Sequence, residues 1–399
     1  MDFIVGYGIE ILEFSESLKS ISLESPDQWS ARRIGSFQLC MTGCHYDSFQ
    51  DKCYIMDGQF SIDGNYFSNL LPKYDDKLMG RTIDKLIADG PRSADSGVFC
   101  VGFVTPDGLD MIVDALWQFP LYWSRIGSGW LVSNNIQYIQ FIMAKNGENV
   151  NIILDSCIEN MVFGGNIAGS THVEQIRLVP FGCKIRGSHV LKFIKFSNVK
   201  VGNYEELLES ASRSVTRHVE SVYSAMHRDE RKVVVDITGG RDSRCVLSFI
   251  LKSGFKGEMS GRCISIYPSP DANIAGGIMS KFDIPVACVP VVQTVAAKHV
   301  NELAVRNNAA LWGGLRSASA PVPGRALSNV IHFSGAFGEI GGGLTVSDYV
   351  SEAIRRAGKY SAALAVDIWM ERRRMARALQ LLTNDAVESV RKKLIISFL

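Results

Sequence analysis

The chain has 399 residues, of which 46 % are hydrophobic and 21 % charged, and its 42 basic and 41 acidic side chains give a net charge of +1. This composition is typical of a folded protein of two or three domains, and it excludes a disordered chain and a small disulfide-bonded scaffold. The balanced charge argues against a nucleic-acid-binding protein, because such domains usually carry a basic excess.

No segment has the pattern of a targeting or membrane sequence. The first 14 residues contain Asp2, Glu10 and Glu13, and no basic segment precedes their apolar residues, unlike a signal peptide. The apolar runs elsewhere are far shorter than the roughly 18 residues of a transmembrane helix. We therefore expect a cytoplasmic protein with no membrane partner.

The nine cysteines fit a reducing compartment, since none of them forms a CxxC pair. Cys40, Cys44 and His45 lie close together in the sequence, which raises the alternative of a metal site. Without distant partner residues we interpret the two cysteines as buried or half-buried thiols.

Short apolar or alternating runs bounded by Gly, Asp, Pro or Asn predict a β-rich first half. The predicted strands are residues 2–6, 38–42, 53–56, 98–104, 110–114 and 130–133. A Pro-Asp-Gly turn at 106–108 separates two of these runs, so we expect residues 98–104 and 110–114 to pair as a hairpin. Residues 74–88 carry apolar residues at helical spacing and predict one helix.

The second half alternates helix and strand. Residues 203–226 carry one apolar stripe at steps of three or four, which predicts an amphipathic helix, and the nearly all-apolar run 232–237 suits a buried parallel strand. The chain then predicts a helix through Ile250 that ends at Gly254, a strand at 263–266, a helix at 272–282 and a strand at 286–291. This alternation implies right-handed βαβ units in a doubly wound sheet. The boundary between the halves is expected between residues 169 and 203.

The strongest chemical signal is the string VVVDITGGRDSR at 233–244, where a buried strand leads through a Gly pair into a helix. Glycines let the backbone approach an anion closely, and a helix N-terminus offers unpaired N–H groups and a partial positive charge. Thr238 and Ser243 add hydroxyl groups, and Asp242 adds a carboxylate, which suits a phosphate site only if a cation such as Mg²⁺ lies between the charges. No Gly-Lys-Ser/Thr follows, so this is not a Walker A loop. The alternative is a tight strand-to-helix turn without a ligand.

This string resembles the pyrophosphate-binding loop of the N-type ATP pyrophosphatases, SGGxDS, with Thr238 in place of the first Ser. The segment HFSGAFGEIGGG at 332–343 is similar to the SGxGxDE motif of their asparagine-synthetase branch. It departs from that motif at Phe337, which replaces a Gly, and at Glu339, which is a single acidic residue where the family has two. Taken alone, the alternative for this segment is a Gly-rich surface loop. Residues 268–271 also resemble the turn where the family's main chain holds adenine.

The first half is similar to the class II glutamine amidotransferase domain that precedes the synthetase in this family. Residues 3–6, 56–59, 114–122 and 131–134 match its segments in order, so the resemblance spans roughly residues 1–345. It implies an N-terminal α+β Ntn-hydrolase-like sandwich at 1–185. It also implies a C-terminal doubly wound parallel α/β sheet at 195–399, an ATP pyrophosphatase domain of the adenine nucleotide α-hydrolase type.

Two departures bear on glutamine hydrolysis. The family nucleophile is an N-terminal Cys freed by removing Met1, but the second residue here is Asp2, which cannot act as a thiolate. Asp57 stands at the position of the oxyanion-hole Asn, where an anion would repel the developing oxyanion. We therefore expect an inactive glutaminase domain, as in the β-lactam synthetases and lasso-peptide cyclases, whose amine comes from the substrate.

The C-terminal part is short for the family. Some 60 residues follow Glu339, and the basic helical tail at 351–399 contains no residue that we can match to the family's late Lys. The chain is then shortened, or a second copy or another polypeptide completes the site, or the synthetase is degenerate.

The resemblance implies a synthetase of natural-product biosynthesis that uses ATP and Mg²⁺ to adenylate a small-molecule or peptide carboxylate, which an amine then attacks. The residues implied for ATP are Ile237, Thr238, Gly239, Gly240, Asp242, Ser243, Ile266, Ser334 and Gly335. Asp242 and Glu339 would hold Mg²⁺ and so serve catalysis. The alternative is a degenerate nucleotide-binding or scaffold partner in a biosynthetic complex. A third interpretation, ATP-driven modification of an RNA base, finds no support in the net charge of +1.

Overall fold

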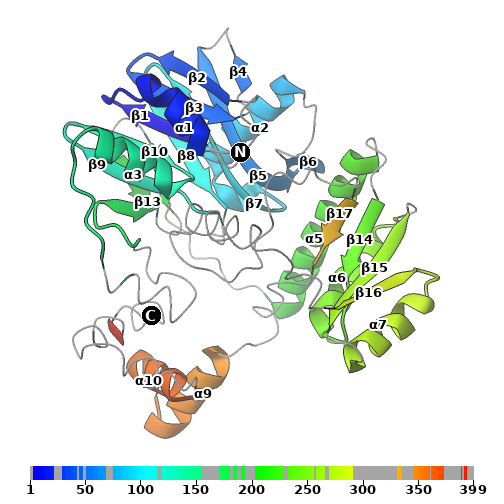
Figure 1. The fold of residues 1–399 in the computed structure, drawn as a ribbon. Helices are drawn as coiled ribbons and strands as arrows, with labels where there is room; N and C mark the ends of the chain where they lie inside the picture. Colours follow the sequence, from blue (N-terminus) through cyan, green and yellow to red (C-terminus); the bar gives the residue numbers. More distant parts are fainter. Residues whose placement is uncertain are drawn as a thin grey trace.

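The computed structural model describes most of both halves of the chain (Figure 1). The described residues are 3–21, 29–42, 45–47, 51–68, 75–114, 119–153, 156, 171–179, 183–186, 190–193, 203–227, 232–255, 258–265, 269–290, 330–334, 346–359, 361–372, 388 and 391–392. No helix within these ranges is long and apolar enough to cross a membrane.

The first half contains two antiparallel sheets. The first sheet has the order β11-β9-β10-β1-β3-β2. Its strands are β1 (Phe3–Tyr7), β2 (Trp29–Ile34), β3 (Phe37–Thr42), β9 (Tyr122–Ile126), β10 (Gly129–Ser133) and β11 (Ile176–Leu178). The central strand β1 pairs with β10 on one side and with β3 on the other, so the start of the chain lies in the middle of this sheet.

The second sheet has the order β13-β12-β8-β7-β5-β4, and β6 pairs with β5 off this path. Its strands are β4 (His45–Asp47), β5 (Lys52–Ile62), β6 (Asn65–Ser68), β7 (Ser96–Thr105), β8 (Gly108–Val113), β12 (Cys183–Arg186) and β13 (Val190–Phe193). The expected hairpin is confirmed as β7–β8, which pair up to Thr105 and Gly108. The strand expected at 53–56 runs on to Ile62. It does so through Gly58, which must be glycine because its φ is +93° and because a Cβ there would collide with the backbone oxygen of Val98.

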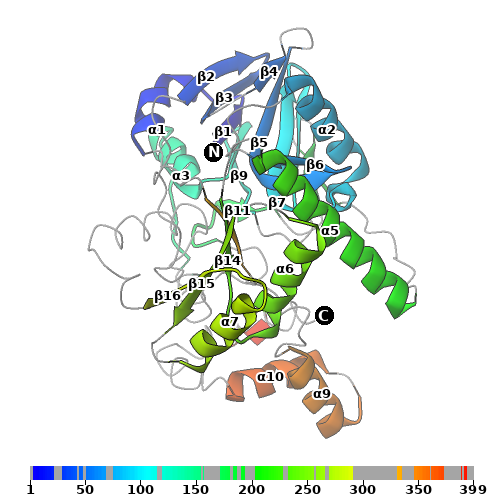
Figure 2. The ribbon, with the colours of Figure 1, turned by 90° about the vertical axis from the view of Figure 1, so that its right-hand side faces the viewer.

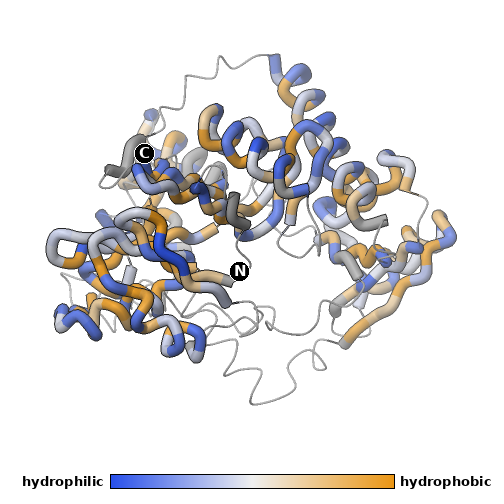
Figure 3. Tube along the Cα trace, turned by 90° about the horizontal axis from the view of Figure 1, so that it is seen from above, coloured by the Kyte–Doolittle hydropathy of each residue, from blue (hydrophilic) through white to orange (hydrophobic). Residues whose placement is uncertain are grey.

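The two sheets pack face to face and helices cover their outer faces, which makes a four-layer α+β sandwich. Residues from both sheets, such as Phe3, Val132, Ile55 and Met111, are fully buried between them. Helices α1 (Ser15–Ile21) and α3 (Ile136–Lys145), with a 3₁₀ turn at Leu12–Phe14, cover the first sheet. Helix α2 (Asp76–Asp89), followed by a 3₁₀ turn at Pro91–Ser93, covers the second. Because both faces of each sheet are covered, central strands such as β1, β5 and β10 are buried along nearly their whole length. Hydrophobic residues are mixed with hydrophilic ones along the helices and strands of the chain (Figure 3).

The second half contains a parallel sheet with the order β16-β15-β14-β17. Its elements are β14 (Lys232–Asp236), α6 (Arg241–Lys252), β15 (Met259–Ser265), α7 (Pro270–Ser280), β16 (Val286–Pro290) and β17 (Val330–Phe333). All three strand pairs are parallel, which confirms the α/β class expected for this half. From β14 the chain adds β15 and then β16 on one side of the sheet. It then returns to place β17 on the other side of β14, so the strand order reverses at β14. Helices α9 (Val346–Ala357) and α10 (Ala362–Arg372) pack against each other further on.

Helix α5 (Tyr204–His227) connects the two halves (Figure 2). Val219 belongs to the core of the parallel sheet, whereas Val222 packs with Tyr66 of β6. The helix matches the stripe expected at 203–226. The second sheet of the N-terminal half extends to Phe193, because β13 pairs with β12 along its whole length. This strand lies beyond residue 185, the expected end of the N-terminal domain.

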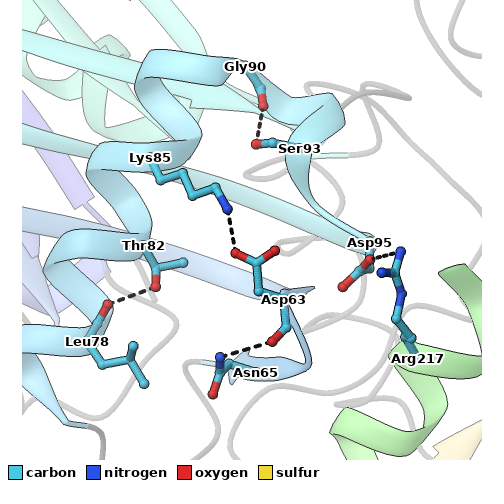
Figure 4. Close-up of polar contacts among 9 residues, drawn as sticks. All are labelled: Asp63, Asn65, Leu78, Thr82, Lys85, Gly90, Ser93, Asp95 and Arg217. Atoms are coloured by element: carbon cyan, nitrogen blue, oxygen red, sulfur yellow. Dashed lines mark hydrogen bonds and ion pairs between the residues drawn. The ribbon is translucent and has the colours of Figure 1, made fainter.

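The contact between α5 and the N-terminal unit is polar as well as apolar. Arg217 pairs with Asp95 at 2.7 Å, next to the Lys85–Asp63 pair of the N-terminal unit (Figure 4). His218 Nδ1 lies 2.8 Å from Ser61 Oγ, and the ring meets Tyr66 edge-on. Burial lowers the pKa of His218 to about 4, although the nearby Asp95 acts in the opposite direction.

We expect this contact to weaken in mild acid. An unfolded chain protonates His218 near pH 6.5, whereas the folded protein keeps it neutral until about pH 4, so the unfolded state binds more protons as pH falls through this window. The free energy of unfolding should therefore fall by up to about 3 kcal/mol between pH 6.5 and pH 4. Urea titrations of the wild type and of His218→Asn across this range measure the effect.

The Asn variant should be less stable at pH 7 but should show a shallower acid dependence. His332 also has a lowered pKa and is retained in both proteins, so the difference between the two slopes isolates His218. Equal slopes for the two proteins would contradict the assignment.

Candidate functional site

The loop Ile237–Gly240 follows the central strand β14 and leads directly into α6. Ile237 is fully buried and donates its N–H to Arg262 O, which continues the ladder between β14 and β15 by one residue. Beyond it the chain turns away from the sheet at the carboxyl end of β14. Strand order reverses here, and this is the position where ligands of open α/β sheets bind.

Ser243 holds the loop in shape. Its Oγ accepts the N–H of Thr238 at 3.1 Å and lies 3.2 Å from Thr238 Oγ1. Thr238 Oγ1 in turn accepts the N–H of Gly240 at 3.1 Å. Ser243 is 6 % exposed, so this small network is an internal brace rather than a surface contact. The two hydroxyl groups expected to donate to phosphate are therefore already hydrogen-bonded to the loop itself.

The helix that follows the loop begins without a side-chain cap. Gly240 is its N-cap residue and has no side chain to accept the first N–H groups, and the first turn includes Asp242. An uncapped N-terminus with unpaired N–H groups and the positive end of the helix dipole favours an anion. Arg244 Nε donates to Gly240 O at 3.2 Å and supports the same turn from the other side.

Gly239 meets the start of the neighbouring helix α7. Its N–H donates to Asp271 Oδ1 at 2.9 Å. A Cβ at this position would lie only 2.5 Å from that oxygen and 3.0 Å from Ile274 Cδ1, so any other residue would require the ends of these two side chains to shift. Helices α6 and α7 therefore bring their N-termini to one place at the carboxyl edge of the sheet.

The structure places Ser334 beside this loop. It follows β17, which pairs with β14 so that Phe333 lies opposite Val235. Ile237, Thr238, Gly239, Gly240, Asp242 and Ser243 form one continuous stretch, and Ser334 joins them from the adjacent strand. Ile266, Gly335 and Glu339 lie outside the described residues, so the proposed pair of Asp242 and Glu339 stays a prediction. Within the described ranges no three His, Cys, Asp or Glu residues are grouped to hold a metal ion.

A charged pair below the loop was not apparent from the sequence. Arg262 Nε and Nη2 donate to the two oxygens of Asp236 at 2.7 and 2.9 Å, which ties the ends of β14 and β15 together. His332 lies nearby, and burial followed by the charge of Arg262 lowers its pKa. Asp236 belongs to the string at 233–244, but the sequence does not show which residue it pairs with. The pairing of β14 with β15 places Arg262 opposite it.

The position of the expected glutaminase site in the N-terminal unit holds a buried carboxylate. Asp57 is 5 % exposed, and its two oxygens accept the N–H of Gly58 at 2.9 Å and the amide of Asn134 at 2.7 Å. Asn134 Oδ1 accepts the N–H of Phe3 at 3.0 Å, so the network reaches the start of β1. The N–H of Gly58 and the amide of Asn134 are therefore both engaged by the Asp57 carboxyl group. Asp2 lies outside the described residues.

Cys100, the register partner of Asp57, is poorly suited to act as a nucleophile. Cys100 lies opposite Asp57 in the pairing of β7 with β5 and is fully buried. Burial raises the pKa of its thiol well above the ordinary value, and the charges of Asp57 and Asp114 raise it further. A thiol held neutral in this way is a poor nucleophile.

Comparison with known families finds no matching family model, and no characterised protein matches the sequence. Among solved structures, the chain is similar to the glutamine phosphoribosylpyrophosphate amidotransferase from B. subtilis in complex with ADP and GMP. The TM-score is 0.33 at 8 % identity, over 72 % of this chain and 65 %, less than two thirds, of that chain. A structure described as the allosteric regulatory enzyme of purine biosynthesis gives a TM-score of 0.31 at 8 % identity, over 73 % of this chain and 80 % of that one.

We expect no glutamine hydrolysis by this protein. Purified protein incubated with glutamine should release glutamate at the rate of a no-enzyme control, because Asp57 fills the donor site and Cys100 stays a thiol. Asp57→Asn should not restore activity, since it supplies no nucleophile. Cys100→Ala is the matched control. Glutamate release by the wild type that this variant lost would contradict the interpretation and identify Cys100 as the nucleophile.

Proposed function

We propose that the protein is an ATP-dependent synthetase that binds ATP with Mg²⁺ at the Thr238–Ser243 loop, adenylates a carboxylate and releases pyrophosphate. An amine, on the same molecule or on a second substrate, then attacks the acyl-adenylate, so that an amide bond forms, the acyl–phosphate bond breaks and AMP is released. The observation that carries the proposal is the position of the loop. A glycine-rich turn with an uncapped helix N-terminus lies at the carboxyl end of the central strand, where strand order reverses.

The residues of this loop fit a polyphosphate. Gly239 has no Cβ, so an oxygen can approach its backbone closely. The carboxylate oxygen of Asp271 already does so and accepts the N–H of Gly239. The first N–H groups of α6, which have no partner within the helix and no side-chain cap, supply further donors. The loop thus presents hydrogen-bond donors on a rigid brace formed by Thr238 and Ser243.

Each residue has a role in this proposal. The N–H of Gly239 and the first N–H groups of α6 bind the pyrophosphate part of ATP, whereas Thr238, Gly240 and Ser243 keep the loop in the shape that binds it. The main chain at Ile237 and Ser334 lies beside the adenosine. Asp242 holds Mg²⁺, which when bound offsets the negative charge at the reacting phosphate. The loop orients the α-phosphate toward the carboxylate, and this positioning contributes to the rate.

The choice of a carboxylate as acceptor and of an amine as second substrate rests on the resemblance to asparagine synthetases. The buried Asp57 supports a synthetase that takes its amine from a substrate rather than from glutamine. The N-terminal unit then serves as a structural support for the synthetase through α5.

Nucleotide binding is tested by neutralising Asp242. Asp242→Asn should weaken binding of Mg²⁺–ATP about tenfold or more, which corresponds to about 1.4 kcal/mol or more, because a neutral amide is a poorer ligand for the metal. Isothermal titration calorimetry measures the change. Asp283→Asn is the matched control, since Asp283 is an exposed residue beyond the far end of α7. Unchanged affinity in Asp242→Asn would contradict the role of Asp242.

Adenylation is tested by ATP–pyrophosphate exchange with pools of carboxylic acids. The proposed enzyme should incorporate labelled pyrophosphate into ATP only in the presence of the correct acid, and Asp242→Asn should lose the exchange. Binding of Mg²⁺–ATP without exchange in any pool would reject the synthetase and favour a nucleotide-binding partner in a complex.

A further inference from the structure

Asp271 belongs to another helix, α7, but contacts the loop at the N–H of Gly239. It is in the first turn of α7, whose start is fixed by Ser269, since Ser269 Oγ accepts the N–H of Ala272 at 3.1 Å. From this position Asp271 Oδ1 accepts the N–H of Gly239 at 2.9 Å. Asp271 is exposed, so its carboxylate can leave this contact for water without a burial cost.

Gly239 provides the exchangeable donor of the loop. The N–H of Ile237 donates to a strand carbonyl, that of Thr238 to the buried Ser243, and that of Gly240 to Thr238 Oγ1. These three acceptors are parts of the sheet or of the loop itself. Only the acceptor of Gly239, among the N–H groups at 237–240, is a side chain from outside the loop.

A phosphate oxygen bound by the N–H of Gly239 needs the place that Asp271 Oδ1 occupies. The N–H of Gly239 carries a single proton, which Asp271 Oδ1 already accepts at 2.9 Å, so a phosphate oxygen and this carboxylate oxygen compete for one hydrogen bond. Asp271 must therefore move aside when a phosphate binds, and it then remains as a negative charge within a few ångströms of the phosphate. Two such anions repel each other strongly unless a cation lies between them.

We propose that Asp271 is a specificity residue that makes the loop reject metal-free phosphates and accept Mg²⁺-bound nucleotide. The inference rests on the proposed function, because it assigns a second carboxylate to the same site. Asp242 attracts the metal from α6, whereas Asp271 competes with the ligand for the N–H of Gly239. A free polyphosphate must displace Asp271 and then bear its repulsion, while Mg²⁺ offsets the repulsion.

The test removes the charge and keeps the shape. Asp271→Asn retains an oxygen that can accept the N–H of Gly239, whereas Asp271→Ala removes the acceptor entirely. Calorimetric titrations of ATP and of inorganic pyrophosphate are made in excess EDTA and again in excess Mg²⁺. In EDTA both variants should bind at least about tenfold more tightly than the wild type, and in Mg²⁺ the affinity for ATP should change less than about threefold.

Asp283→Asn is the charge-matched control, because it removes the same charge beyond the opposite end of α7, about 16 Å along the helix. It should behave as the wild type in both buffers. Thermal unfolding checks that all variants are folded, and the comparison with Asp271→Ala separates lost charge from lost hydrogen bonding.

The outcomes separate this inference from the proposed function. If the wild type binds Mg²⁺–ATP and the Asp271 variants gain nothing in EDTA, the inference fails and the nucleotide site stands. If the Asp271 variants lose affinity for Mg²⁺–ATP tenfold or more, Asp271 is a metal ligand and the inference is overturned. If no protein binds ATP or pyrophosphate in either buffer, the nucleotide site and the inference are both rejected.

Discussion

The pairing of β14 with a neighbour on each side is the constraint on which the candidate site depends. Val233 and Val235 anchor this strand in the core, and its register with β15 and β17 sets which residues emerge at the carboxyl edge. The loop that follows thereby lies between the start of α7 and the end of β17. A slip of one residue in either pairing would turn the Val side chains away from the core, so burial protects the geometry of the loop.

Hydrogen bonds within the loop and to the first turn of α6 hold the loop in its conformation. Ser243 and Thr238 satisfy each other's polar groups, and the Asp236–Arg262 pair ties together the two strands beneath them. Such a loop keeps its shape without a ligand, which lowers the conformational entropy that binding would otherwise cost. The N–H of Gly239 is bound by a carboxylate from another helix, which links ligand binding at this N–H to charge.

Helix α5 makes the N-terminal unit part of the same structure. One face packs on the parallel sheet through Val219, and another meets the N-terminal sheet through His218 and Val222. Phe333, which directly precedes Ser334, packs against the same cluster as Val222. The N-terminal unit is thus in contact with the strand that ends at the candidate site.

Local patterns in the sequence were enough to predict several helices, strands and turns of this protein. The apolar spacing of α5, the all-apolar run of β14, the hairpin turn at 106–108 and the glycine loop before α6 each depend on residues close together in the chain, and each is confirmed. The roles of Ile266, Gly335 and Glu339 stay predictions. Periodicity and turn chemistry act over a few residues, which is why a single sequence is enough to recognise them.

Only the tertiary structure decided which distant residues meet. Asp236 with Arg262, Gly239 with Asp271, and His218 with Ser61 are separated by 26, 32 and 157 residues. Their contacts depend on strand register, on the order reversal at β14 and on the packing of α5 between the two units. These are set by the burial of many side chains at once, so no local pattern carries them, and the charges that surround the loop become visible only after the chain has folded.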